Sequence, residues 1–130
     1  MPDDSELKMW IVLRQDIEMP LGKAMVQAAH AVQAATILAL EYDDPTNLFY
    51  RGEARLKLYL EQNMPKITVK AKNLAAMDRA FKETFEAGIP ASYIRDAGRT
   101  VFAEETPTVV GIGPCYYSEL PRFVQRLQLL

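Results

Sequence analysis

The pattern of apolar and polar positions predicts four strands in this chain. Residues 9–13 form a continuous apolar run, which is typical of a strand buried on both faces, and residues 108–112 form a second such run. Residues 66–70 alternate strictly between polar and apolar side chains, which predicts an edge or half-exposed strand. A short strand is expected over residues 92–95. The first and fourth strands along the chain are therefore expected inside the sheet, with the second and third at its edges.

Between the strands, apolar residues recur at helical spacing. Residues 22–42 are rich in Ala and predict a long helix that can lie close against a sheet, because its side chains are small. A Pro at position 45 follows soon after the predicted end of this helix. A second helix is expected over residues 51–62. A third is expected between Asn73, a typical N-cap, and Gly88, which ends it. The last is expected over residues 117–129, with Ser118 as N-cap and Pro121 in the first turn.

Strands that alternate with helices indicate an α/β sandwich, with helices on both faces of a mostly parallel sheet. The 130 residues, 49% of them apolar, are enough for one hydrophobic core and too few for two. We therefore expect one domain, residues 1–130. The sequence shows no internal repeat, low-complexity tract or interdomain linker.

Composition limits the partners and the compartment. With 15 Lys and Arg against 17 Asp and Glu, the formal net charge is −2, so a polyanion must be met by a local patch. A single cysteine, Cys115, rules out an internal disulfide and fits a reducing compartment, and with one His a zinc site is not expected. The acidic N-terminus carries no targeting signal, and polar residues interrupt the apolar run over residues 24–40. We expect a cytoplasmic protein that needs no metal or cofactor and does not enter a membrane.

Three strings of residues concentrate chemically useful groups. The first, residues 22–31 (GKAMVQAAHA), contains the only histidine, and helical spacing places Lys23, Gln27 and His30 on one face. The second, residues 96–100 (DAGRT), begins at the carboxyl end of a predicted strand, where open α/β sheets place working residues. The third, TVVGIGP, begins at residue 108 on the last predicted strand. Together they indicate a site.

The ordered motifs resemble the type 2 peptidyl-tRNA hydrolases, the Bit1-like family. The opening strand KMWIVLRQD is followed in order by GK, QAAHA, PKITVK, DAGRT and GIGP, which covers most of the chain. The resemblance implies a three-layer α/β/α sandwich on a four-stranded mixed sheet with strand order 2-1-4-3. It also implies an esterase, without a cofactor, that cleaves a peptide from the 3′ ribose of tRNA.

The resemblance directs attention to five catalytic candidates: Lys23, His30, Asp96, Thr100 and Thr108. Asp96 or His30 is the candidate base, and the sequence does not decide between them. Lys23, near the start of a helix, suits an oxyanion or a phosphate. The substrate-binding candidates are Gln27, Gly98, Gly111 and Gly113, with Lys66, Lys70, Lys72 and Arg99 as a tRNA-facing patch. Structural alternatives stay open for most of these residues. His30 is then a packed or surface histidine, Lys23 a solvated first-turn lysine, and the DAG segment an ordinary turn. Gly111 and Gly113 relieve crowding, and the lysines protect an edge strand.

The chain departs from the family pattern at two polar positions and in one segment. Ala29 stands where Ser commonly precedes the histidine, Val101 stands where Gln commonly follows DAGRT, and residues 43–53 match poorly. A divergent RNA- or protein-binding module without catalysis therefore stays open, as does a nucleotide-binding enzyme that uses Lys23 and the glycines. A homodimer through Tyr116, Tyr117 and residues 127–130 is also possible from their apolar character.

Overall fold

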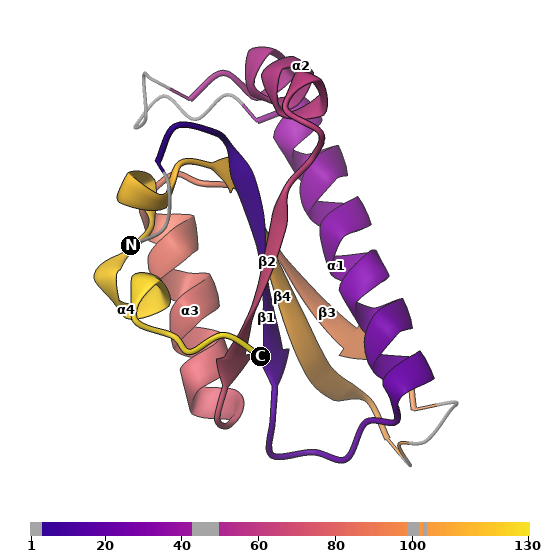
Figure 1. Cartoon of the computed structure of the whole chain (residues 1–130). Helices are drawn as coiled ribbons and strands as arrows, with labels where there is room; N and C mark the ends of the chain where they lie inside the picture. Colours follow the sequence, from indigo (N-terminus) through magenta and orange to yellow (C-terminus); the bar gives the residue numbers. More distant parts are fainter. Residues whose placement is uncertain (1–3, 43–49, 99–101, 103) are drawn as a thin grey trace.

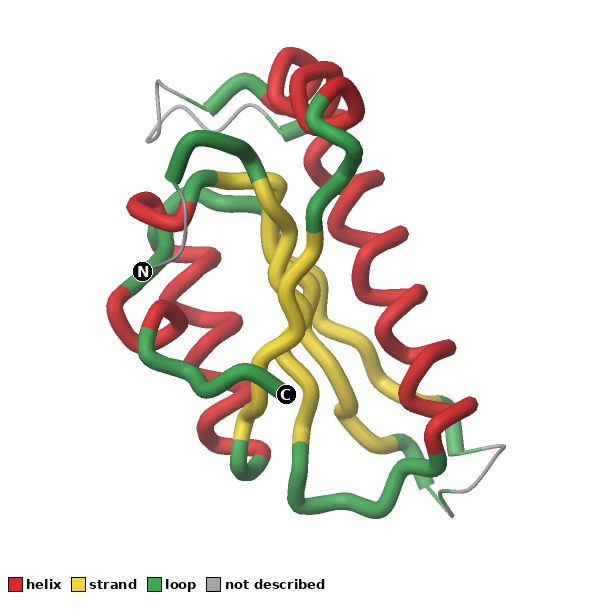
Figure 2. Tube along the Cα trace, viewed as in Figure 1, coloured by secondary structure: helices red, strands yellow, loops and turns green. Residues whose placement is uncertain are grey.

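A single four-stranded sheet forms the centre of the computed structural model, which describes residues 4–42, 50–98, 102 and 104–130 (Figures 1 and 2). Its order is β2-β1-β4-β3. The strands are β1 (Lys8–Arg14), β2 (Lys66–Ala71), β3 (Ala91–Asp96) and β4 (Thr106–Cys115). The predicted order, with its two inner and two edge strands, is confirmed.

The direction of the strands corrects one expectation. Strand β2 runs parallel to β1, but β4 runs antiparallel to both β1 and β3, so the sheet is mixed and not mostly parallel. Strand β4 begins soon after β3, and a connection that short forms an antiparallel pair, because a parallel pair needs a crossover of about a dozen residues or more. Strands β1, β2 and β3 consequently end at the same edge of the sheet.

Helices cover both faces of the sheet, as Figure 1 shows. Helix α1 (Leu21–Leu40) lies across one face, with α2 (Gly52–Glu61) packed near its C-terminal end. Helix α3 (Leu74–Glu86), the short η1 (Tyr117–Glu119) and α4 (Arg122–Gln125) lie on the other. The predicted Asn73 cap is confirmed, since its side-chain oxygen accepts the N–H of Ala76 at 2.9 Å. No helix in the described part of the chain is long and apolar enough to span a membrane.

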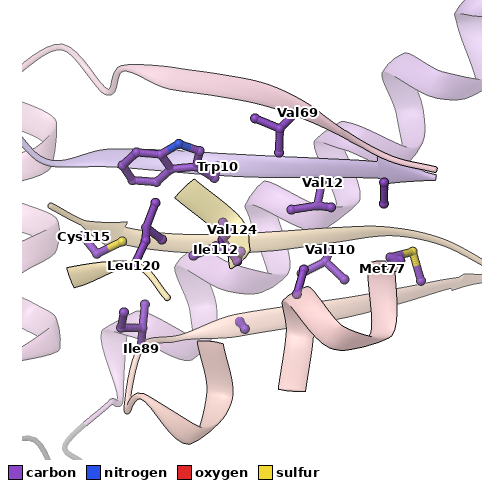
Figure 3. Close-up of a cluster of buried hydrophobic side chains, with 13 residues drawn as sticks. Trp10, Val12, Val69, Met77, Ile89, Val110, Ile112, Cys115, Leu120 and Val124 are labelled. Atoms are coloured by element: carbon purple, nitrogen blue, oxygen red, sulfur yellow. The ribbon is translucent and has the colours of Figure 1, made fainter. Parts of the chain in front are cut away.

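Alternation along β1 builds a core on each side of the sheet. Trp10 and Val12 join the larger cluster with Met77 of α3, drawn in Figure 3, whereas Met9 and Ile11 pack on the side of α1. All four side chains are buried, which confirms the prediction of a strand covered on both faces. Each face thus holds its helices by apolar burial.

Helix α1 approaches the sheet closely because small residues meet at the contact. A Cβ atom on Gly111 would lie only 2.4 Å from the backbone oxygen of Ala31. The hydroxyl of Ser92 in β3 donates to that same oxygen at 2.8 Å and accepts the N–H of Gly111 at 3.2 Å. Gly111 therefore permits close packing between helix and sheet, which is the structural alternative to phosphate binding.

The C-terminal segment contradicts the prediction of a helix over residues 117–129. Pro121 restricts the residue before it, and Leu120 is extended with ψ 144°, so η1 and α4 are separate and Ser118 caps neither. The chain then returns to β2: the N–H of Lys70 donates to Gln128 at 2.8 Å, and the N–H of Leu130 donates to Thr68 at 3.0 Å. The outer edge of β2 is thereby partly covered.

Candidate active site

The candidate site lies at the end of the sheet that is formed by the C-terminal ends of β1, β2 and β3. Asp96 is the last residue of β3, and Thr108 lies on the neighbouring β4. Lys23 lies in the first turn of α1, whose N-terminus reaches this edge at the bottom of Figure 1. Residues far apart in the sequence therefore meet at one end of the molecule.

A buried ion pair joins two of the predicted catalytic residues. The Nζ atom of Lys23 contacts Oδ1 of Asp96, and their side chains are only 12% and 6% exposed. The other carboxylate oxygen, Oδ2, accepts the N–H of Gly98 at 3.0 Å. Gly98 has φ +80°, a left-handed conformation that glycine adopts without strain. The attraction between the two charges offsets the cost of removing each from water. The Lys23 ammonium has three N–H donors, so it can also bind a further anion.

A second buried contact lies one helical turn further along α1. The Thr108 hydroxyl donates to Oε1 of Gln27 at 2.5 Å and lies 3.4 Å from the backbone oxygen of Ile94. Gln27 is 2% exposed and Thr108 is fully buried. Since positions 23 and 27 lie on one face of α1, this contact holds the helix against β4 beside the ion pair.

His30 does not join these residues. It is exposed and lines a separate open hollow between α1 and β3, with Tyr93 and Arg95 among the lining residues. His30 is exposed because it lies about 100° around the helix axis from the buried Ala31, although it stays on the same side of α1 as Lys23, seven residues earlier. It also lies about 10 Å along the helix from Lys23. The expectation that His30 shares one cleft with Lys23 and Asp96 is therefore not met.

The remaining substrate-binding candidates are divided between the two ends of the sheet. Lys70 lies at the end of β2, near the candidate site, whereas Lys66 lies at the opposite end, where Nζ donates to the backbone oxygen of Met64 at 2.9 Å. Gly113 is also at that far end, with φ +107° beside Lys8. Arg99 and Thr100, with Val101, lie outside the described residues.

Arg14 is a residue at this edge that the sequence reasoning did not assign to the site. It ends β1; Nε donates to Asp16 at 2.6 Å, and one terminal nitrogen donates to the backbone oxygen of Pro107 at 3.1 Å. The hydrogen bond from Arg14 outweighs slight burial and lowers the pKa of Asp16. Arg14 thus ties β1 to β4 beside the ion pair. Its signal in the sequence is an Arg-x-Asp spacing directly after an apolar strand.

The single cysteine is not part of this edge. Cys115 ends β4 at the opposite end of the sheet and is fully buried, and burial raises the pKa of its thiol well above the ordinary value. Among the residues that the structure describes, no group of three His, Cys, Asp or Glu side chains is placed to hold a metal ion. The groups gathered here are instead an ammonium, a carboxylate, an amide and a hydroxyl, which suit proton transfer and binding of an anion.

Comparison with known proteins gives one consistent result. The family model described as Peptidyl-tRNA hydrolase PTH2 matches residues 7–130. A peptidyl-tRNA hydrolase of Aeropyrum pernix is 34% identical over 122 residues, 94% of each chain. Those of Sulfurisphaera tokodaii and Sulfolobus acidocaldarius are 34% and 38% identical, over 95% and 83% of this chain and 98% and 87% of their own.

Proposed function

Because the chain belongs to the peptidyl-tRNA hydrolase PTH2 family, we propose that it hydrolyses peptidyl-tRNA. The bond cleaved is the ester between the carboxyl carbon of a peptide and the 3′ ribose oxygen of tRNA. The observation that carries the proposal is the buried Lys23–Asp96 ion pair at the carboxyl ends of the strands, the place where open α/β sheets bind ligands.

In the proposed reaction, the Asp96 carboxylate accepts a proton from a water molecule while the water oxygen attacks the ester carbon. Negative charge then develops on the carbonyl oxygen, and the Lys23 ammonium stabilises it. Collapse of this intermediate breaks the bond between the carbon and the ribose oxygen. The proton returns from Asp96 to that oxygen, so the products are a free peptide carboxyl group and a tRNA with a 3′ hydroxyl.

Gln27 and Thr108 act in this proposal by positioning. The Thr108 hydroxyl donates its proton to Gln27, and this buried contact holds α1, and with it Lys23, in place against β4. Thr100, carried over from the family resemblance, supplies a hydroxyl for the water or the ester carbonyl. Arg99 and Lys70 are assigned to the tRNA phosphates.

The test compares two candidate bases in an assay that follows cleavage of N-blocked aminoacyl-tRNA. Asp96→Asn is expected to lose about 10²-fold or more in kcat, whereas His30→Ala keeps most of the activity because His30 is remote from the ion pair. Asp78→Asn is the matched control, since Asp78 accepts from Tyr93 at 2.5 Å on another face of the sheet. Circular dichroism checks that each variant is folded.

Each contrary outcome of this assay has a definite meaning. Loss of activity in His30→Ala with activity kept in Asp96→Asn would transfer the role of base to His30. No turnover by the pure wild-type protein would contradict the proposed function and favour the non-catalytic binding module.

We also propose a cytoplasmic location, where peptidyl-tRNA arises, and a homodimer formed through the C-terminal residues. Leu129 and Leu130 are 68% and 60% exposed, whereas Tyr116 and Tyr117 pack against the protein's own core and have less surface to offer. Sedimentation of the wild type and of a Leu129→Ser variant tests the dimer. A monomer at all concentrations of the wild type would contradict it.

A further inference from the structure

A hollow at the same end of the sheet as the candidate site, beside α3 and α4, carries concentrated positive charge. It has a volume of about 580 Å³, and three of its lining residues are cations, Lys70, Lys72 and Arg126. The other lining residues are uncharged: Gln15, Ala76, Phe123, Leu127 and Gln128. We call this the basic hollow. Its lining includes no carboxylate that would neutralise the three charges.

Five cations of the described chain are neutralised by a carboxylate, and the three in the basic hollow are not among them. Arg14, Lys23, Arg55, Arg79 and Arg95 each form an ion pair with a carboxylate. The side chains of the basic hollow form no ion pair with any described residue. Like charges that converge on one concavity repel each other, and a bound anion relieves that repulsion.

The fold of the C-terminal segment builds this hollow. Because residues after α4 return to β2, with the N–H of Lys70 bonded to Gln128, Arg126 is carried beside the end of β2. Phe123 forms part of the apolar wall, and the guanidinium carbon of Arg79 lies 4.2 Å from the centre of its ring. A continuous helix over residues 117–129 would not bring these groups together.

Two further hollows lie between this region and the N-terminus of α1. Gln15 lines both the basic hollow and a neighbouring one, which Ala24 of α1 also lines. Ile17 lines that neighbour and a third hollow, which contains Pro20 just before α1. Strands β2 and β3 are separated by three strand spacings, about 14 Å in all. A ligand that touches both Asp96 and the basic hollow must therefore be extended, as a nucleic acid strand is.

We infer that the basic hollow binds backbone phosphates of the single-stranded 3′ end of the tRNA substrate, while the ester lies at Lys23 and Asp96. The inference rests on the proposed function. Lys70, Lys72 and Arg126 contact the phosphates, and a ribose or base packs against Phe123 and Leu127. Arg126 and Phe123 thereby extend the tRNA-facing surface predicted from Lys70 and Lys72, whereas Lys66, at the far end of the sheet, lies outside it.

The test removes two charges from the hollow in the Lys72→Gln/Arg126→Gln double variant. For the tRNA substrate we expect KM to rise about tenfold or more, with kcat unchanged. The slope of log KM against the logarithm of the salt concentration is expected to fall by about 1.4, which corresponds to the loss of two contacts with single-strand phosphates. Hydrolysis of an N-blocked aminoacyl-adenosine, which lacks the preceding nucleotides, is expected to stay unchanged. The matched control is Lys57→Gln/Lys82→Gln, which removes two exposed cations that line none of these hollows.

Two results of the assay would overturn the inference. One is an equal rise in KM for the control variant, which would mean that only overall charge matters. The other is an equal loss on the adenosine ester, which would mean that the substitutions act through the catalytic centre. Equilibrium binding of uncharged tRNA is measured beside the assay. A wild type that binds tRNA without hydrolysing peptidyl-tRNA would contradict the proposed function alone. A double variant that binds tRNA as tightly as the wild type would contradict the role of the hollow.

Discussion

Two largely buried ion pairs lie at opposite ends of the sheet, and they differ in how many contacts the cation of each pair makes. Arg55 of α2 binds Glu119 through two contacts, at 2.5 and 2.8 Å. Its guanidinium carbon also lies 4.5 Å from the ring centre of Tyr50 and 5.4 Å from that of Tyr116. Lys23, by contrast, makes one contact, with Oδ1 of Asp96, while Oδ2 of Asp96 accepts the N–H of Gly98.

The surroundings of Glu119 strengthen this contrast. Burial raises its pKa, but the hydrogen bonds from Arg55 and from the N–H of Tyr116, together with the charge of Arg55, outweigh burial, and the net pKa is lowered. The bidentate geometry and the two rings leave little capacity for a ligand. The comparison teaches that one pair completes the structure, whereas the other retains N–H donors that a substrate can use.

The largest expected effect is on catalysis, from Lys23→Met. Methionine fills similar space but cannot donate to the developing oxyanion. The rate constant of ester cleavage, measured in single-turnover hydrolysis, is therefore expected to fall about 10²- to 10³-fold. The variant also leaves the Asp96 charge buried without its partner. The double variant Lys23→Met/Asp96→Leu is therefore expected to recover stability in urea unfolding without recovering activity. If the double variant recovered activity as well as stability, the Lys23–Asp96 ion pair would have only a structural role.

Arg55→Met is expected to show the opposite behaviour. It leaves Glu119 largely buried without its partner, so the free energy of unfolding falls by about 3 kcal/mol. Its kcat, measured at a temperature where the variant remains folded, is expected to equal that of the wild type. A loss of rate as large as that of Lys23→Met would remove the distinction between the two pairs.

A smaller effect is expected from Tyr50→Phe. Tyr50 is fully buried, and its hydroxyl donates to the backbone oxygen of Pro114 at 2.8 Å, so its removal costs about 1–2 kcal/mol of unfolding free energy. Tyr117→Phe is the matched control, because the Tyr117 hydroxyl makes no hydrogen bond with a described residue. Equal losses in the two variants, measured by urea titration, would show that this hydrogen bond contributes nothing specific.

The smallest effect concerns acid sensitivity. Since the pKa of Glu119 is lowered in the folded protein, its charge stabilises the fold above the ordinary value of 4.5, and that stabilisation is lost as the pH falls through the folded pKa. Glu119→Gln is expected to be less stable at neutral pH and to lose less stability below pH 4.5. Part of the dependence remains because the pKa of Asp16 is lowered too. Parallel stability curves for variant and wild type would contradict the assignment.

Local patterns in the sequence were sufficient for much of the fold. The uninterrupted apolar run of β1 and the alternating lysines of β2 predict which strands are inside and which are at the edge, because burial on two faces or one dictates side-chain type. Asn73 predicts where α3 begins, because its side chain accepts a hydrogen bond from the backbone N–H three residues later. The resemblance to the family added the mixed sheet and its order.

Interactions between distant residues decided the rest. Helical spacing places His30 on the same side of α1 as Lys23, but it does not tell how far along the helix the site extends. The pairing of the last residues with β2 depends on backbone groups that no side-chain pattern records. Likewise, the contact between Lys23 and Asp96 joins residues 73 positions apart, and the motifs mark both without stating that they touch.

The close approach of Ala31 to Gly111 has a consequence for ligand discovery. Because backbone meets backbone there, and Ser92 bonds to both, α1 cannot turn or slide without losing buried hydrogen bonds. Compounds that target Lys23 must then match a rigid receptor wall, so a stiff scaffold with a correctly spaced carboxylate should outperform a flexible one of equal size.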